Sequence, residues 1–189
     1  MAPWVTGNLL VASPSLGHAS FRRTVVAILE HDDDGALGVV LNRASDVPVA
    51  QVLPDWADRS AEPGTLFFGG PVGTDGVLGL VVGSVRVAPS GVARLVEPSP
   101  GARPLATLVD LDQPETVPCG ASARLFAGYA GWAAGQLEAE LAAEAWFVVP
   151  ALESDLVAPR WDVLWRVVLA RQQFPLNLLA GFPDDPSLN

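Results

Sequence analysis

The segment TVVAILEHDDDGALGVVLN, residues 24–42, contains the strongest indication of the fold. It consists of two apolar, β-branched segments of strand length, Thr24–His31 and Ala36–Asn42, which are joined by Asp32-Asp33-Asp34-Gly35. An Asp-Gly pair between two such segments predicts a β-hairpin, because glycine accepts a positive φ and aspartate stabilises the turn. Both segments are apolar on both faces through their middles. We therefore expect the hairpin to lie centrally in a sheet that is covered on each side.

Further strands are predicted outward from the hairpin, wherever short apolar runs end at glycine or proline. They are expected at Asn8–Ala12, Thr65–Phe68, Val77–Val82, Ser122–Ala127 and Trp146–Val149.

Two helices are predicted in the C-terminal half, and the remaining segments are expected to be irregular. The helices are expected at Ala133–Ala145, from its apolar stripe, and at Pro159–Gln173, which begins with proline at a favourable first position. Gly128 and Gly131 are expected to bend the chain sharply from strand to helix. The irregular segments are one or two helical turns at Pro48–Trp56, a loop at Pro89–Pro104 and an extended tail at Pro175–Asn189.

These elements predict an α+β fold with residues 1–189 in a single domain. Its expected core is an antiparallel-dominated sheet, curled or barrel-like, flanked by helices. The length of 189 residues fits one domain, since domains commonly contain about 100–200 residues. Half of the residues are apolar, which is enough to bury a sizeable core.

The charge balance restricts the classes of partner. The chain has 21 acidic side chains and 11 basic ones, all of them arginine, for a formal net charge of −10. Affinity for DNA or RNA depends on neutralising phosphates, so this charge argues against direct nucleic-acid binding. The lack of lysine excludes a Walker-type phosphate loop and Schiff-base chemistry.

The sequence favours a cytoplasmic protein with no membrane contact. The single cysteine, Cys119, cannot form an intramolecular disulfide and is interpreted as a small residue in a turn. The N-terminus has no positive charge before its apolar residues and does not resemble a signal peptide. No window approaches the roughly 18 consecutive apolar residues of a membrane span.

Three segments together resemble the AlgH/YqgE family, a family of small bacterial proteins without an assigned biochemical activity. They are FRRTVVAILEHDDDGALGVVLNR (Phe21–Arg43), FGGPV (Phe68–Val72) and FAGYAGWAAGQLEAEL (Phe126–Leu141), with Trp146 following. The resemblance covers nearly the whole chain and implies a compact α+β domain with a barrel-like sheet. The AlgH name refers to a proposed role in transcriptional regulation of alginate production. Because the chain is acidic and shows no clear helix-turn-helix, such a role would require a protein partner.

The titratable residues give no assembled catalytic or metal site. Glu30, Asp32 and Asp34 alternate before a glycine like calcium ligands, but the bidentate glutamate of such a loop is absent, so a solvated hairpin turn is the better interpretation. His18 and His31 are the only histidines, and no further ligands cluster near them. Glu30 and His31 are adjacent strand residues that point to opposite faces, so each needs another partner. We predict no catalytic residues, no metal and no cofactor.

The best site hypothesis is a polar cleft near the Gly-Gly-Pro turn. In this hypothesis the backbone N–H groups of Gly69 and Gly70 face an anion, and arginines and polar side chains from the other two motif segments surround it. The competing interpretation is architectural: the glycines make a tight strand exit, and Gln136 or Glu138 hydrogen-bonds to backbone. The candidate residues are Arg22, Arg23, Glu30, His31, Asn42, Gly69, Gly70, Gln136 and Glu138.

Two function classes follow. The favoured one is a non-enzymatic binding or regulatory module that acts through protein partners. The alternative is a small-molecule-binding protein or an enzyme that uses the polar cleft. The alternative predicts that Arg22, Glu30, His31 and Gln136 converge around one pocket.

Overall fold

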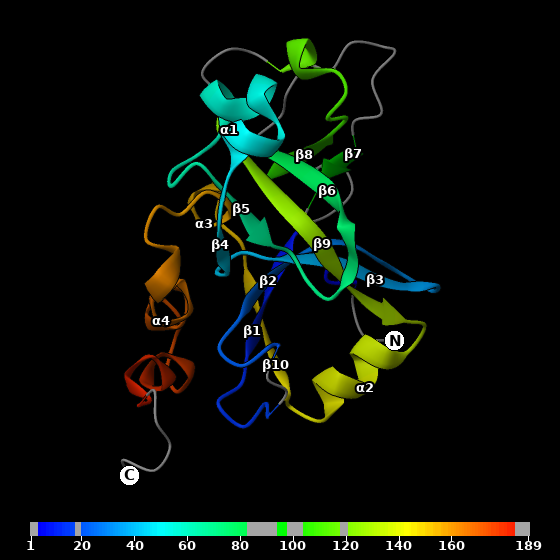
Figure 1. The fold of residues 1–189 in the computed structure, drawn as a ribbon. Helices are drawn as coiled ribbons and strands as arrows, with labels where there is room; N and C mark the ends of the chain where they lie inside the picture. Colours follow the sequence, from blue (N-terminus) through cyan, green and yellow to red (C-terminus); the bar gives the residue numbers. More distant parts are fainter. Residues whose placement is uncertain (1–3, 18–19, 83–93, 98–103, 118–120, 184–189) are drawn as a thin grey trace.

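The structure is a computed structural model that describes residues 4–17, 20–82, 94–97, 104–117 and 121–183. Within these residues, ten strands form one mixed sheet with short helices packed against it (Figure 1). The strands are β1 (Asn8–Ala12), β2 (Val25–Asp32), β3 (Gly35–Val40), β4 (Ala44–Pro48), β5 (Thr65–Phe68), β6 (Val72–Val82), β7 (Arg94–Val96), β8 (Ala106–Val109), β9 (Ala123–Ala133) and β10 (Trp146–Pro150). The α-helices are α1 (Val49–Val52), α2 (Gln136–Ala142), α3 (Glu153–Leu156) and α4 (Leu164–Ala170). The 3-10 helices are Pro54–Arg59, Pro114–Thr116, Trp161–Val163 and Leu176–Gly181.

The sheet is almost entirely antiparallel. Its main path is β10-β1-β2-β3-β9-β6-β8-β7, and the pair β4-β5 joins it through a parallel contact between β5 and β9. Among the described strands, β10 and β7 at the two ends of the path each have one partner, so the sheet is not closed into a barrel. The predicted α+β class and antiparallel character are confirmed, whereas the barrel-like closure is absent from the described strands.

The central hairpin has the predicted form. β2 and β3 pair in an antiparallel register that ends at Asp32 and Gly35. Gly35 has φ 134°, and the Asp32 carboxylate accepts a hydrogen bond from the Asp34 N–H (2.9 Å) across the turn. β2 lies between β1 and β3, so the hairpin is internal to the sheet as expected.

Side chains on β2 alternate between two apolar clusters, as the two-residue period of a strand requires. Val25, Ala27 and Leu29 belong to a cluster that includes Trp165 and other residues of α4. Residues on the other face of β2 belong to a cluster that includes Leu137 of α2. Figure 1 accordingly shows α4 and α2 on opposite sides of β1 and β2. A third cluster packs under α1 at the other end of the sheet.

β9 is longer than predicted, and α2 begins later. The segment around Gly128 and Gly131 does not make the expected bend into a helix; it continues β9 and pairs with β3 and β6. The chain leaves the strand at Ala133 and turns at Gly135, which has φ 75° and precedes α2. The expected bend is therefore wrong in position, because cross-strand pairing on both sides extends β9.

Five further elements differ from the prediction. β4 has no counterpart in the prediction, because its residues (ASDVP) form no continuous apolar run and its pairing depends on β5. β7 lies inside the segment expected to be a loop, and β6 begins earlier than expected. The helix predicted at Pro159–Gln173 consists of a 3-10 turn followed by α4. The predicted extended tail begins with a 3-10 helix, and residues 184–189 lie outside the described residues.

In the described part of the chain, no helix has both the length and the apolar character needed to cross a lipid bilayer.

Candidate functional site

The turn formed by Arg22 and Arg23, just before β2, is held by one buried side chain. Arg23 has φ 55°, a left-handed conformation that is uncommon outside glycine. Asn42 is 3% exposed; its amide accepts a hydrogen bond from the Val25 N–H (2.9 Å) and donates one to the Arg23 carbonyl (2.8 Å). Asn42 thus fixes Arg23 in a strained conformation, and strain of this kind is concentrated at functional sites in proteins.

Arg43 also holds the Arg22–Arg23 turn, through the Arg22 carbonyl. Its guanidinium donates hydrogen bonds to the Arg22 carbonyl (2.5 Å) and to the Asn42 carbonyl (3.2 Å). Partial burial lowers the pKa of Arg43, because desolvation disfavours the charged form. An arginine side chain nevertheless stays protonated at neutral pH, so Arg43 brings a positive charge to the turn.

Four arginines line one groove between this turn and α4, and we call it the arginine groove. It has a volume of about 330 Å³ and is lined by Arg22, Arg23, Asn42, Arg43, Asp162, Trp165 and Arg166. The Arg23 guanidinium lies over the Trp165 ring, 4.7 Å from its centroid. Asp162 is the one acidic residue of this lining, and it forms an ion pair with Arg160 (3.1 Å). The groove therefore concentrates positive charge on a chain whose formal net charge is −10.

Two of these arginines also bind the end of the described chain. Arg166 donates hydrogen bonds to the carbonyls of Ala180 (2.5 Å) and Phe182 (3.0 Å). Arg23 donates to the Phe182 carbonyl (2.9 Å) and also to the carbonyl of Pro183. The guanidinium groups of this region therefore accept main-chain carbonyls as ligands.

A second, more apolar groove adjoins the arginine groove, and we call it the apolar groove. It has a volume of about 290 Å³ and is lined by Ser20, Phe21, Val40, Arg43, Phe68, Gly70 and Pro71. Arg43 lines both grooves, and its carbonyl accepts a hydrogen bond from the Phe68 N–H (2.7 Å). The Phe68 residue is 54% exposed. The two grooves thus meet at Arg43 and differ in chemical character.

Gly69 and Gly70 allow two backbones to approach closely. A Cβ atom at Gly69 would lie 2.2 Å from the Gly128 carbonyl oxygen, and one at Gly70 would lie 2.2 Å from the Tyr129 carbonyl carbon. The Gly69 N–H donates a hydrogen bond to the Ala127 carbonyl (2.8 Å). These contacts give the Gly-Gly-Pro turn an architectural role against β9, and they leave the Gly69 N–H engaged with backbone rather than directed at an anion.

His31 is buried, and both of its ring nitrogens have partners. Nδ1 accepts a hydrogen bond from the Val5 N–H (3.2 Å), and Nε2 lies 3.1 Å from Oε1 of Glu138. Because Nδ1 is an acceptor, the proton of the neutral ring lies on Nε2, which donates to Glu138. The His31 side chain is 1% exposed and the Glu138 side chain 35% exposed. The imidazole therefore joins the N-terminal segment to α2 beneath the surface.

Gln136 belongs to a hydrogen-bond network around two buried tryptophans. Oε2 of Glu140 accepts hydrogen bonds from the indole N–H groups of Trp132 (2.9 Å) and Trp146 (2.7 Å). The Gln136 amide donates to Oε1 of Glu140 (2.9 Å) and accepts from the Ala133 N–H (3.1 Å). The residues from Trp132 to Glu140 are therefore explained by packing: Glu140 supplies the hydrogen-bond acceptor that the two buried indole N–H groups need. Glu140 is absent from the predicted site residues, although two nearby tryptophans are a signal for such an acceptor.

Glu30 lies at a third groove, on the acidic hairpin. This groove has a volume of about 330 Å³, and its lining includes Glu30, Asp32, Asp34 and Trp132. None of the predicted arginines lines it. Negative charge therefore gathers at the hairpin and positive charge at the arginine groove.

The predicted site residues do not surround one cleft. Three of them (Arg22, Arg23 and Asn42) lie at the arginine groove, one (Gly70) at the apolar groove, and one (Glu30) at the acidic hairpin; the others (His31, Gly69, Gln136 and Glu138) have packing or backbone contacts. The predicted convergence of Arg22, Glu30, His31 and Gln136 is wrong, because α2 directs its polar side chains to His31 and to the tryptophans.

Sequence reasoning missed several residues that complete the two grooves. Arg43 follows Asn42 directly and was available as a signal, since it ends the same motif. Trp165 and Arg166 lie far along the chain on α4, and no local pattern indicates that they meet the Arg22–Arg23 turn.

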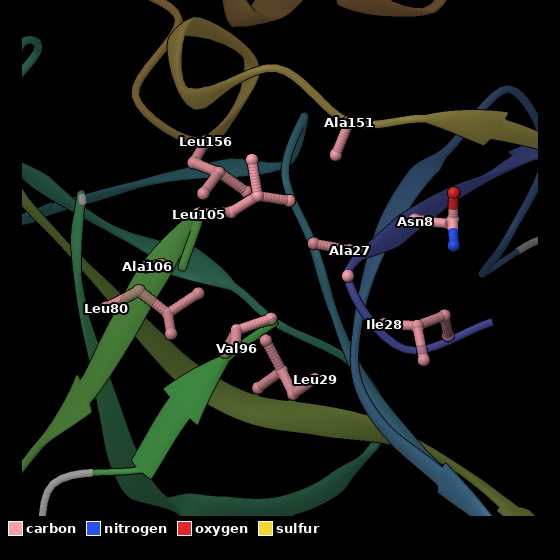
Figure 2. A pocket seen from close by; sticks show the side chains of 11 residues that line it. Asn8, Ala27, Ile28, Leu29, Leu80, Val96, Leu105, Ala106, Ala151 and Leu156 are labelled. Carbon is pink, nitrogen blue, oxygen red and sulfur yellow. The ribbon is translucent and has the colours of Figure 1, made fainter. Parts of the chain in front are cut away.

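The small space between the two halves of the sheet has too little room for a ligand. Its apolar lining comes from β2, β6, β7 and β8 together with Leu105, Ala151 and Leu156, and Gly7 and Asn8 complete it (Figure 2). The volume is about 10 Å³, which is the room needed by one water molecule.

No group of three or more His, Cys, Asp or Glu residues is arranged to hold a metal ion within the described ranges. His18 and Cys119, which the sequence singled out, lie outside those ranges.

A buried arginine away from the grooves, Arg124, supports the fold. It is 2% exposed, lies 4.2 Å from the centre of the Phe67 ring, and donates hydrogen bonds to the carbonyls of Glu62 (2.8 Å) and Ala158 (3.2 Å). Burial lowers the pKa of Arg124 to about 10, which still leaves the side chain charged at neutral pH. Arg124 thus attaches two loops to β9.

Comparisons with known proteins agree with this architecture. The model of the AlgH-like family matches residues 9–177. A UPF0301 protein of Streptomyces coelicolor is 47% identical over 189 residues, covering 98% of this chain and 95% of the relative. A UPF0301 protein of Mycobacterium tuberculosis is 48% identical over 189 residues, covering 97% of this chain and 90% of the relative.

Two solved structures have the same fold. The crystal structure of a Corynebacterium diphtheriae protein is similar with a TM-score of 0.80 and 36% identity, covering 96% of this chain and 94% of that one. The solution structure of the AlgH protein from Pseudomonas aeruginosa is similar with a TM-score of 0.67 and 29% identity, covering 98% of this chain and 97% of that one. From the family model and from relatives that match over nearly their whole length, the chain belongs to the AlgH-like family, also named UPF0301.

Proposed function

We propose that the chain is a non-enzymatic binding module that acts through contact with a protein partner at the arginine groove. The observation that carries this proposal is the convergence of Arg22, Arg23, Arg43 and Arg166 on one groove of an otherwise acidic chain. A local field of opposite sign to the net charge selects partners and orients them on approach.

The strained turn supports the same assignment. Arg23 is kept in the left-handed region by Asn42, and Arg43 holds Arg22. A turn whose backbone is fixed in this way loses little conformational entropy on binding. The groove is therefore organised before a partner arrives.

The contacts of the other predicted residues support a non-enzymatic role. The buried imidazole of His31 is bonded to Glu138, and Gln136 is engaged with Glu140. General acid–base catalysis requires a group within hydrogen-bond reach of a substrate, and these side chains serve the packing of α2 instead.

A small anionic molecule is the alternative ligand. The volume of the arginine groove, about 330 Å³, lies at the lower end of the range for small-molecule sites, which begins near 300 Å³. An enzyme acting on such a molecule belongs to this alternative.

Any role in transcription would pass through the partner, since the formal net charge of −10 opposes direct contact with DNA. The expected place of action is the cytoplasm.

The proposal is tested by capture of partners from a native lysate with two variants of equal charge. Arg22→Gln removes a positive charge from the groove, while Gln51→Glu adds a negative charge on the exposed face of α1. The wild type and Gln51→Glu are expected to recover the same protein, and Arg22→Gln to recover it at least about fivefold less, as for loss of one charged contact. Equal recovery by all three forms, or no specific protein with the wild type, would contradict the proposal.

A further inference from the structure

We infer that the chain's own C-terminal segment is the resident ligand of the arginine groove, with Asp184 and Asp185 paired to the groove arginines. A partner that uses this groove must then displace the segment, so the segment regulates access to the site. This regulatory consequence rests on the proposed function, whereas the docking of the segment does not. We call residues 176–183, which precede the two aspartates, the strap.

Two arginines of the groove hold the main chain of the strap. Arg166 donates hydrogen bonds to the carbonyls of Ala180 (2.5 Å) and Phe182 (3.0 Å). Arg23 donates to the carbonyl of Phe182 (2.9 Å) and to that of Pro183. Because both arginines line the groove, the last residues of the strap lie at the groove itself.

The strap is attached to the surface of the core. Its 3-10 helix, Leu176–Gly181, lies beside α4 (Figure 1). None of residues 176–183 is fully buried, and four apolar side chains of the strap are partly buried against the main apolar cluster: Leu176, Leu179, Ala180 and Phe182. Segments with few buried contacts open at a low free-energy cost. The strap can therefore leave the groove while the sheet stays folded.

The sequence brings two negative charges to the place where the strap ends. Asp184 and Asp185 follow Pro183 directly and lie outside the described residues. Successive Cα atoms are about 3.8 Å apart, so the Cα atoms of both aspartates lie within about 8 Å of the Pro183 Cα. Guanidinium groups bind carboxylates with directed, charge-assisted hydrogen bonds. The pairing of these two carboxylates with the groove arginines is the inferred step.

An intramolecular ligand agrees with the state of the groove arginines. Arg22, Arg23 and Arg166 all take part in interactions within the chain. A ligand that is joined to its site by a short stretch of chain has a high effective concentration, in the millimolar range for short flexible linkers. The two aspartates therefore have an advantage over any free anion or peptide, and a partner must compete with them.

The docking is tested by two double variants of the full-length protein, each of which removes two negative charges. Asp184→Asn/Asp185→Asn removes the inferred ligands. Asp55→Asn/Asp58→Asn is the matched control, because both residues are exposed on the 3-10 helix Pro54–Arg59 and neither lines the groove.

Hydrogen exchange and chemical shifts give the result. The Phe182 N–H, which donates to the Leu179 carbonyl (3.0 Å), is expected to exchange about fivefold faster in Asp184→Asn/Asp185→Asn, as for the loss of one or two exposed ion pairs. The arginine Nε–H signals of Arg22, Arg23 and Arg166 are expected to shift in the same variant. The control is expected to match the wild type in both measurements.

Salt provides a second readout on the wild type. Sodium chloride at about 0.5 M screens exposed ion pairs, so it is expected to accelerate the exchange of the Phe182 amide in the wild type and to have little effect on Asp184→Asn/Asp185→Asn. Exchange and shifts in Asp184→Asn/Asp185→Asn that equal those of the control would overturn the inference.

Partner capture from a native lysate tests the regulatory consequence. Asp184→Asn/Asp185→Asn is expected to recover about fivefold more of the protein that the wild type captures, and the control to recover the same amount as the wild type. Equal recovery by all three forms, with the strap docked as inferred, would show that the strap does not regulate the site.

The outcomes separate this inference from the proposed function. If Asp184→Asn/Asp185→Asn behaves like its control while Arg22→Gln lowers capture, the inference is wrong and the proposed function stands. If exchange and shifts respond as expected but no form captures a specific protein, the proposed function is wrong and the docking of the segment stands. If neither measurement responds, both are wrong.

Discussion

At the scale of single residues, Asn42 determines the shape of the arginine turn. One buried amide accepts from the Val25 N–H and donates to the Arg23 carbonyl, so a single side chain connects β2 to the turn that precedes it. This dual contact needs a donor and an acceptor on one short side chain, which the asparagine amide supplies. Asn42 therefore positions Arg23.

Replacing Asn42 by Ala is expected to lower the free energy of unfolding by about 1–3 kcal/mol, because it leaves a buried N–H and a carbonyl without partners. Urea unfolding measures the change, and Gln51→Ala on the exposed face of α1 is the control. A change in Asn42→Ala no larger than in the control would show that the amide does not hold the turn.

Glu140 has a comparable role on the opposite side of the sheet. Its carboxylate accepts from both Trp132 and Trp146, whose rings lie 6.1 Å apart and are nearly perpendicular. Phe21 contacts both rings, so the cluster also supports the segment that leads to the arginine turn.

Glu140→Ala is expected to destabilise the fold by about 2 kcal/mol, since two indole N–H groups lose their acceptor. It should also weaken the near-ultraviolet circular dichroism of the tryptophans. Asp58→Ala, at an exposed position in the 3-10 helix that follows α1, is the comparison. Unchanged stability and an unchanged aromatic spectrum would argue against the network.

At the scale of elements, the backbone of the Gly-Gly-Pro turn lies in direct contact with the backbone of β9. A Cβ atom at Gly128 would lie 2.7 Å from the carbonyl oxygen of Gly70 and 2.8 Å from that of Val72. The close approach of these two backbone segments therefore explains why glycines occur in both motifs. This close approach also places Phe68 and Gly70 at the apolar groove.

Gly70→Ala tests the close approach. Its Cβ would lie 2.2 Å from the Tyr129 backbone, and Gly70 has φ 157°, so we expect a loss of about 3 kcal/mol or more from overpacking and backbone strain. Gly17→Ala, where a Cβ meets nothing within 4 Å, should be near neutral. Thermal unfolding of the two variants side by side gives the answer, and similar midpoints would refute the close approach.

The elements that could be predicted are those specified by local pattern. The hairpin at β2 and β3 is encoded by two apolar runs and an Asp-Gly turn, and its predicted form is confirmed. The course of β9 past Gly128 could not be predicted from sequence, because pairing with β3 and β6 decides it. The same limit applies to the site: Arg22 and Asn42 stand in one motif, while Arg166 reaches them only through the packing of α4.

At the scale of the whole molecule, charge is divided between separate regions. The acidic groove of Glu30, Asp32 and Asp34 lies on the β2-β3 hairpin, and the arginine groove lies between the start of β2 and α4. The negative net charge repels nucleic acid at long range. Among the grooves of the described residues, the arginine groove is lined mainly by positively charged side chains.

Site-specific crosslinking in the living cell examines the proposed partner contact where it occurs. A photoreactive benzoylphenylalanine replaces Phe68 at the apolar groove or, as a control, the more exposed Phe174. We expect one reproducible protein adduct from position 68, its loss when Arg22→Gln is added, and no such adduct from position 174. An adduct that forms equally from both positions, or a position 68 that yields none, would rule out a partner at these grooves.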